Sequence, residues 1–235
     1  LVAKWDFDNY DPENPTSSAI LAPTVGSLAA VPYTGTSSST EVTDGTLGAI
    51  TVLAPSETGL YDGDYALSIP KGAHLWMPLP SGIVNDKCWT IRIRFNMPAS
   101  SDTVLNALIS GKLDTIGNGI WYVSALNLIQ GSETIFGTSV EENRNTTGKI
   151  GTNQSNGTVP FRQVSRGAWH TFATHFGPNA TSSTLDGYRS VSLSNASDVR
   201  TQFTGDGFVL CGSGNSVTTY IASVEVWEDT PIYRD

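Results

Sequence analysis

Two acidic residues on either side of a tryptophan, Glu225 and Glu228 around Trp227, are the first candidates for chemistry in this sequence. A glycosidase uses two carboxyl groups that face one groove, about 5 to 5.5 Å apart in retaining enzymes and about 6.5 to 9.5 Å apart in inverting ones. Residues that share a face of a regular strand differ by an even number, whereas these glutamates are three positions apart. The spacing argues against a catalytic pair, and we predict no catalytic residue in this chain.

The three histidines, His74, His170 and His175, do not form a metal-binding pattern. His170 and His175 are an odd number of residues apart on one expected strand, so without a bulge they cannot both ligate one ion. The sequence also lacks His-Glu-x-x-His, Cys-x-x-Cys and Gly-x-Ser-x-Gly. We therefore predict no metal site, while a Ser/His/Asp arrangement assembled by the fold stays open.

Five side chains are candidates for binding a ligand. Arg92 and Arg94 alternate with apolar residues, so both are expected on a polar strand face, where they could bind an anionic or hydroxyl-rich ligand or pair with surface acids. Trp121 and Tyr122 are adjacent, which places one of the two rings outside the core. That ring, or Trp76, could offer the flat surface on which a sugar stacks.

Strands must position these side chains, because period-two alternation recurs along the chain and helical periodicity hardly occurs. The clearest strand, CWTIRIRFNM, covers residues 88 to 97 and has one apolar and one polar face. Weaker patterns occur at 2–8, 49–54, 65–70, 74–79, 105–113, 119–129, 133–139, 169–176, 188–194, 207–212 and 218–229. These short strands predict an all-β, two-sheet antiparallel β-sandwich that forms one domain over residues 1–235.

Within this fold, three tryptophans are expected in the core: Trp5, Trp89 and Trp169. In the closing strand, the alternation predicts one face that packs on the core and a second face that carries Glu225 and Trp227. The core face consists of Tyr220, Ala222, Val224 and Val226. Two polar stretches, 34–46 and 140–158, are expected to be long surface loops.

Composition excludes several classes of partner. The net charge is −9 and no basic cluster is present, so nucleic acid is not an expected partner. No apolar run approaches the roughly 18 to 20 residues of a membrane helix, so membrane insertion is not expected. The chain begins at Leu1 and shows no signal peptide, as in a mature or excised segment. Cys88 and Cys211 could form one disulfide or remain free thiols.

The chain contains, in this order, LVAKWDFDN, YALSIPKGAHLWMPLP, CWTIRIRFNMP, RGAWHTFATHF and YIASVEVWE. This order resembles the concanavalin A-like superfamily, especially its laminin G-like jelly-roll modules. The resemblance implies a jelly roll that is extracellular or attached to the cell surface, often binds carbohydrate, and in other members is structural or adhesive. Relatives that hydrolyse glycans carry Glu-x-Asp-x-Glu, which is absent from this sequence.

The resemblance also raises the question of a structural calcium ion. Where the final strand of the family commonly has an aspartate, this chain has Ala222, or Ser223 if the register slips by one, and neither supplies a carboxylate. Asp6, Asp8 and Asp11 could contribute oxygen ligands or could be solvated acids at a strand end. No cofactor is predicted, and structural calcium is left open.

These observations favour a non-catalytic carbohydrate-binding module of a secreted or cell-surface glycan-handling protein, with a poly- or oligosaccharide as partner and a multidomain parent. The expected ligand-binding residues are Arg92, Arg94, Trp121, Tyr122 and Trp76. The first alternative is a structural or adhesive module that binds protein through its long loops. The second is a divergent glycoside hydrolase or lyase.

Overall fold

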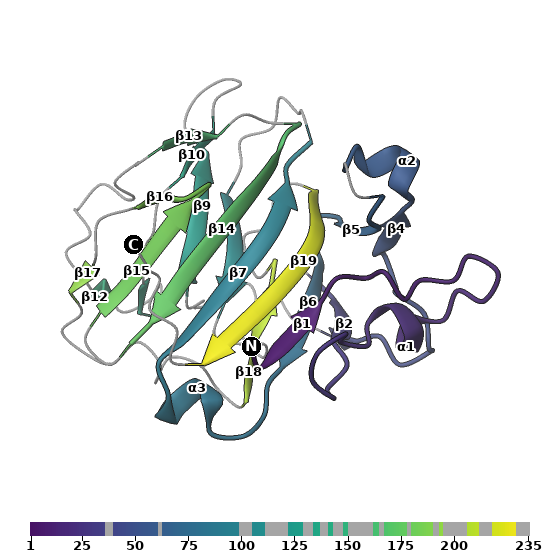
Figure 1. The fold of residues 1–235 in the computed structure, drawn as a ribbon, viewed down its shortest axis with the longest axis horizontal. Helices are drawn as coiled ribbons and strands as arrows, with labels where there is room; N and C mark the ends of the chain where they lie inside the picture. The colour runs from purple at the N-terminus through teal and green to yellow at the C-terminus, as the bar shows by residue number, and fades with distance from the viewer. Residues whose placement is uncertain are drawn as a thin grey trace.

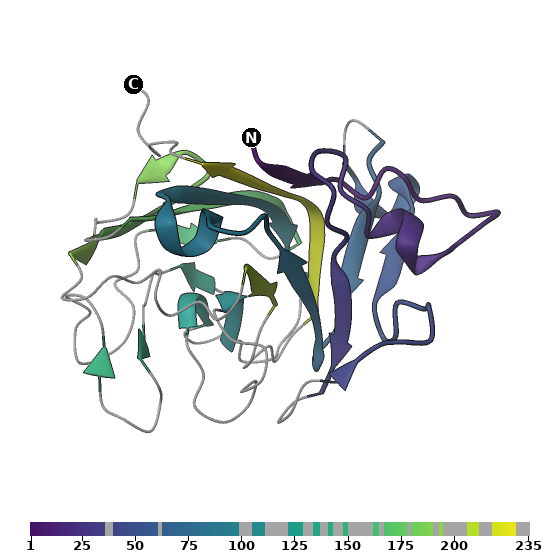
Figure 2. The same ribbon diagram turned by 90° about the horizontal axis from the view of Figure 1, so that it is seen from below.

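The chain folds into two antiparallel sheets stacked face to face, which confirms the predicted all-β sandwich (Figures 1 and 2). The computed structural model describes residues 1–35, 40–60, 63–98, 105–110, 122–128, 134–136, 141–142, 148–149, 162–164, 167–177, 180–189, 193–194, 206–211 and 218–228.

The first layer is a nine-stranded sheet, seen face-on in Figure 1. Its strands lie in the order β16 (Tyr188–Arg189), β15 (Ala180–Leu185), β14 (Trp169–Phe176), β7 (Trp89–Asn96), β19 (Thr219–Glu228), β5 (Ala66–Ile69) and β4 (Thr51–Leu53). Two short strands complete it: β1 (Ala3–Trp5) pairs with β19, and β17 (Leu193–Ser194) pairs with β15. The first and last strands of the described chain are therefore neighbours.

The second layer is an eight-stranded sheet. Its strands lie in the order β13 (Arg162–Val164), β10 (Thr134–Phe136), β9 (Tyr122–Leu128), β8 (Leu105–Ser110), β18 (Gly207–Leu210), β6 (Ala73–Pro78), β2 (Val31–Thr34) and β3 (Thr40–Glu41). A separate pair consists of β11 (Glu141–Glu142) and β12 (Gly148–Lys149). Parts of both predicted loops, 34–46 and 140–158, thus form short ladders.

Helical structure in the described residues is limited to single turns: α1 (Ser17–Ile20), α2 (Pro55–Thr58) and α3 (Ile83–Asp86). Across the part of the chain that the structure describes, no helix is long and apolar enough to cross a membrane.

The core lies between the two sheets and is centred on β7. Every second residue of that strand is buried, as predicted: Trp89, Ile91, Ile93, Phe95 and the following Met97. The Trp89 ring contacts Phe176 of the same sheet at a centroid distance of 4.5 Å and Phe208 of the opposite sheet at 6.2 Å. Its indole N–H donates a hydrogen bond to the Val84 carbonyl over 3.1 Å, so this large ring is buried without leaving a polar atom unpaired.

A bulge in β19 changes the predicted faces of the closing strand. Ile221 pairs with Phe95 and Ser223 with Arg94, so Ala222 is an extra residue without a partner in the ladder. The extra residue shifts the alternation by one, and Ile221 rather than Tyr220 lies in the core. The predicted core face is therefore wrong before the bulge and right after it, where Val224 and Val226 are fully buried.

Two further burial predictions are corrected. Ala222 is buried, but in a small cluster with Leu60 and Ala66 that is separate from the main core. Trp169 packs against the same cluster and is only partly buried, whereas Trp5 lies in the core as predicted. The Trp169 indole N–H donates a hydrogen bond to the Thr58 carbonyl over 2.7 Å, which holds the α2 segment against the sheet.

The two cysteines are free thiols, which resolves the alternative left open by the sequence. Cys88 is partly exposed immediately before β7. Cys211 is fully buried after β18, in a left-handed backbone conformation with φ of 53°. Burial raises the pKa of the Cys211 thiol to about 12.

Candidate functional site

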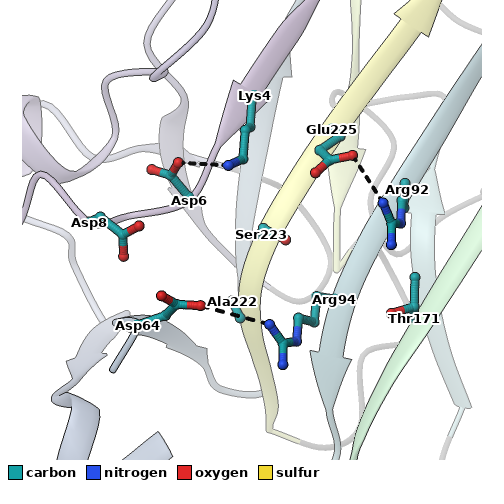
Figure 3. Close-up of a pocket in the computed structure, with 10 residues that line it drawn as sticks. All are labelled: Lys4, Asp6, Asp8, Asp64, Arg92, Arg94, Thr171, Ala222, Ser223 and Glu225. Carbon is teal, nitrogen blue, oxygen red and sulfur yellow. Dashed lines mark ion pairs between the residues drawn. The ribbon is translucent and has the colours of Figure 1, made fainter. Parts of the chain in front are cut away.

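A pocket of about 230 Å³ opens on the outer face of the nine-stranded sheet, on the side away from the core (Figure 3). Strands β1, β19, β7 and β14 form its floor and one side, and the segments around Asp8 and Asp64 form the other. Its lining is polar: Lys4, Asp6, Asp8, Asp64, Arg92, Arg94, Thr171, Ala222, Ser223 and Glu225. It therefore offers three cations and four carboxylates to a ligand.

Strand register brings the charged side chains together. Lys4 of β1 lies opposite Glu225 of β19, and Glu225 lies opposite Arg92 of β7. A basic, an acidic and a basic side chain thus stand in one row across three strands. The next row on the same face consists of Ser223, Arg94 and Thr171. Ser223 and Glu225 both follow the bulge and are two residues apart, so they face outward together.

The two arginines hold their partners loosely. Arg92 Nη1 lies 3.6 Å from Glu225 Oε2, and Arg94 Nη1 lies 3.7 Å from Asp64 Oδ2. Both distances exceed those of hydrogen bonds. The arginine side chains are 56% and 36% exposed, and a guanidinium carries five N–H donors. Within the described part of the chain, these ion pairs are their only polar contacts, so their donors are open to a ligand.

The acidic side of the pocket is more tightly organised. Lys4 Nζ lies 3.1 Å from Asp6 Oδ2, which also accepts a hydrogen bond from Thr24 Oγ1 over 2.9 Å. Hydrogen bonding to Asp6, together with the negative charges of Asp6, Glu225 and Asp8, raises the pKa of Lys4 against the opposing effect of burial. The other oxygen of Asp6, Oδ1, is buried and has no hydrogen-bond partner among the described residues.

Asp8 is a pocket carboxyl group with a raised pKa. Partial desolvation raises its pKa, and the negative charges of Asp6 and Asp64 raise it further. A hydrogen bond from the Tyr65 backbone and the charge of Lys4 act in the opposite direction and are weaker. The pocket therefore contains one carboxyl group with a raised pKa beside carboxylates held in ion pairs.

These acids, as arranged, do not fit a calcium ion. Calcium takes about six to eight oxygen ligands, with carboxylates prominent among them. Asp6 is paired with Lys4 and Asp64 with Arg94, so two of these carboxylates already have cationic partners. Ala222 adds no side-chain oxygen. Among the described residues, no group of three or more His, Cys, Asp or Glu side chains could hold a metal.

Trp227 lies beside the pocket on the same face of β19. It follows Glu225 by two residues, and its indole Nε1 donates a hydrogen bond to Glu225 Oε2 over 3.2 Å. Its cross-strand neighbour is Thr90, and the ring is partly exposed. Trp227 is therefore neither a core residue nor a free surface side chain, because a pocket carboxylate fixes its orientation.

The structure does not bring the five predicted ligand-binding residues into one site. Arg92 and Arg94 line the pocket on the nine-stranded sheet. Trp76 belongs to β6 of the eight-stranded sheet and is partly exposed, between two core residues of that strand. Tyr122 begins β9, but its side chain is outside the described residues, as is the whole of Trp121. Trp76 therefore does not line this pocket, and its role in ligand binding stays a prediction.

Sequence reasoning did not identify the rest of the pocket. No sequence motif points to Lys4, or to Asp64, which follows an Asp-Gly pair typical of turns. The sequence suggests Asp6 and Asp8 as calcium ligands or solvated acids, and Glu225 as half of a catalytic pair or as a residue on the second face of the closing strand, but not as parts of one pocket. The available signal was that Lys4, Asp6 and Asp8 alternate at the start of the chain, which places them on one face.

The three histidines lie at separate places. His74 is buried, with Nδ1 against the Cys211 carbonyl and Nε2 2.7 Å from the Gly35 carbonyl. His170 Nδ1 lies 2.8 Å from Asp186 Oδ2, and His175 Nδ1 lies 3.2 Å from Thr90 Oγ1. No two of them share a metal site in the described chain. The contacts of His74 and His170 join strands to neighbouring loops and turns.

No protein-family model matches this chain, and no curated protein matches its sequence. Two of the similar solved structures illustrate TM-scores below 0.5. The binding domain of botulinum neurotoxin DC in complex with SialylT is 9% identical and covers 97% of this chain and 47% of that chain, with a TM-score of 0.49. A carbohydrate esterase from Shiga toxin-encoding bacteriophage phi24B is 14% identical and covers 85% and 98%, with a TM-score of 0.47. These scores are too low to support an inference.

A third solved structure is similar over nearly the full length of both chains. It is domain 4 of AbnA, a GH43 extracellular arabinanase from Geobacillus stearothermophilus, in complex with arabinotriose. The alignment covers 97% of this chain and 92% of that domain, at 17% identity and a TM-score of 0.57. This chain is thus similar in fold to domain 4 of that arabinanase.

Proposed function

We propose that this chain is a non-catalytic carbohydrate-binding module of a secreted or cell-surface protein, and that it binds a glycan in the pocket on the nine-stranded sheet. The observation that carries the proposal is the row formed by Lys4, Glu225 and Arg92, in which hydrogen-bond donors and acceptors alternate across three strands. A sugar presents neighbouring hydroxyl groups that both donate and accept hydrogen bonds. A row of alternating cations and carboxylates complements that pattern.

The state of the arginines supports the proposal. Their ion pairs are single contacts of 3.6 and 3.7 Å at an exposed surface, and such pairs contribute about 0–1 kcal/mol to stability. Rearranging them to bind hydroxyl groups therefore costs little. The similar domain of the arabinanase was solved with arabinotriose, which makes this trisaccharide a reasonable first probe.

Calorimetric titration of the folded protein with arabinotriose and with a panel of neutral and acidic oligosaccharides tests the proposal. We expect binding by at least one glycan and a loss of affinity of at least tenfold, about 1.4 kcal/mol, when Arg92 and Arg94 are both replaced by Ala. Lys71→Ala is a suitable control, because Lys71 is exposed in a turn and does not line the pocket. Absence of binding to every glycan, with a folded sample, would refute the proposal.

One observation favours an enzyme as a second candidate. A general acid in glycoside hydrolysis needs a raised pKa, and partial desolvation together with neighbouring negative charge raises the pKa of Asp8 in a pocket that holds three further carboxylates. Release of reducing ends from a bound glycan, abolished by Asp8→Asn while binding persists, would establish this activity. Binding without product release would leave the non-catalytic module as the function.

The adhesive alternative depends on residues 140–158, most of which are outside the described part of the chain. Its test is independent of the pocket. Recovery of a protein partner that is lost when this segment is shortened, and kept in the Arg92→Ala/Arg94→Ala variant, would favour adhesion over glycan binding.

A further inference from the structure

We infer that the binding site extends beyond the pocket to Trp227, which forms a second, aromatic subsite, and that the ligand is a neutral oligosaccharide of at least two units. This inference rests on the proposed function. It adds the direction in which the glycan runs, along β19, and the charge class of its sugar units.

The geometry of β19 makes the two subsites continuous. After the bulge, Ser223, Glu225 and Trp227 alternate on the outward face. Successive residues on one face of a strand are about 6.6–6.8 Å apart. Glu225 lines the pocket and also accepts the hydrogen bond from Trp227, so the indole ring lies directly beyond the edge of the pocket.

The ring is oriented before any ligand arrives. Its N–H is held by Glu225 Oε2 at 3.2 Å, and the same oxygen faces Arg92 Nη1 at 3.6 Å. The opposite position on β7 is the short side chain of Thr90, and the indole stays partly exposed. A partly exposed aromatic ring with a fixed orientation provides a stacking surface and loses little entropy on binding.

The size and charge of the pocket define the ligand further. A volume of about 230 Å³ is below the roughly 300 Å³ at which pockets for drug-sized ligands begin, so the pocket suits a single sugar unit. Its lining contains one more carboxylate than cations, and the whole chain carries a charge of −9. A uronic acid chain would meet repulsion from both, whereas neutral hydroxyl groups can use the donors and the acceptors.

Titration with arabino-, xylo- and cello-oligosaccharides of one to three units, and with galacturonic acid oligomers of the same lengths, tests the inference. We expect the affinity of the preferred neutral series to rise at least tenfold from one unit to two. Trp227→Ala should remove this gain and weaken binding of the two-unit ligand more than binding of the single unit, whereas Trp227→Phe should keep most of the gain.

Tyr33→Ala is the matched control, because Tyr33 is also a partly exposed aromatic residue but belongs to β2 of the eight-stranded sheet. It should bind as the unmodified protein does, and thermal unfolding should verify that each variant is folded. Length-dependent affinity that Trp227→Ala leaves intact, or tighter binding of galacturonic acid oligomers, would overturn the inference while the proposed function stands. If no sugar binds, both fail. If sugars bind but Arg92→Ala/Arg94→Ala has no effect, the pocket is not the site and both fail.

Discussion

The indole N–H of Trp227 donates a hydrogen bond to Oε2 of Glu225 over 3.2 Å, and this one oxygen also faces a guanidinium. Glu225 therefore connects an aromatic surface with a polar pocket. Its side chain is 18% exposed, which leaves it accessible to a ligand while its neighbours restrict its motion. In this arrangement, a residue that is unsuited to catalysis by its spacing organises the proposed binding site.

Replacing Glu225 separates its charge from its role as a hydrogen-bond acceptor. Glu225→Ala should weaken glycan binding at least tenfold, because the indole ring loses its anchor and the pocket loses an acceptor. Glu225→Gln keeps an oxygen acceptor for the indole N–H and should lose less affinity. Calorimetric titration measures both, and the free energy of unfolding should change by only about 0–1 kcal/mol because the ion pair is a single 3.6 Å contact to an exposed arginine. Equal loss in both variants would show that the charge of Glu225 is what matters.

Sequence reasoning predicted the sandwich because its central strand is regular. The alternation from Trp89 to Met97 is unbroken. The rule that every second residue shares a face therefore predicted the two faces of this strand correctly and placed Arg92 and Arg94 outside the core. In β19 the same rule predicted the wrong face for the residues before Ser223. The reason is the bulge at Ala222, which inserts one residue and cannot be recognised from the sequence pattern.

The candidate site was harder to predict than the fold because it depends on register between strands that are far apart in the sequence. Lys4 and Glu225 are at opposite ends of the described chain and meet only because β1 pairs with β19. Asp64 reaches the pocket from a loop, which alternation does not describe. Single-strand patterns give the direction of a side chain but not its neighbours across the sheet.

Asp8 should make stability depend on pH in a defined direction. Because its pKa is raised above the ordinary value of 3.8, its contribution to stability is fully present below that value and is lost as the pH rises through the folded-state pKa. Asp8→Asn should therefore raise the melting temperature at pH 7, and the difference should shrink as the pH approaches 4. Thermal unfolding at a series of pH values measures this effect.

Asp44 provides a control of opposite sign. Hydrogen bonds from the Thr46 hydroxyl and backbone N–H lower the pKa of Asp44, so its contribution is present above the ordinary value and is lost as the pH falls through the folded-state pKa. Asp44→Asn should lower the melting temperature at pH 7, and the difference should shrink as the pH falls below 3.8. Shifts of the same sign in both variants would contradict the assignment of these causes.

His74 should contribute to stability through its two backbone contacts. Its ring joins the carbonyls of Gly35 and Cys211, which lie on either side of β6 in the sequence. His74→Leu supplies an apolar side chain of similar bulk but removes the ring N–H, of which a neutral imidazole has one, so at least one carbonyl loses its donor, and a buried unpaired carbonyl costs about 1–3 kcal/mol. Tyr33→Phe, which removes only an exposed contact of 3.3 Å to Glu41, should change the unfolding free energy by less than about 0.5 kcal/mol. Chemical denaturation compares the two, and equal small effects would mean that the His74 contacts are not stabilising.

The two thiols should differ sharply in reactivity. Thiolate is the reactive form of cysteine, and Cys211 is fully buried with its pKa raised to about 12, whereas Cys88 is partly exposed. A disulfide reagent at pH 8 should therefore titrate one thiol per native chain and two in denaturant, and Cys88→Ala should abolish the native reaction. Because the folded-state pKa of Cys211 is raised, its contribution to stability is lost as the pH rises toward 12, so Cys211→Ala should reduce the alkaline dependence of unfolding. Rapid modification of Cys211 in the native Cys88→Ala variant would show that the segment after β18 opens readily, contrary to the packing described above.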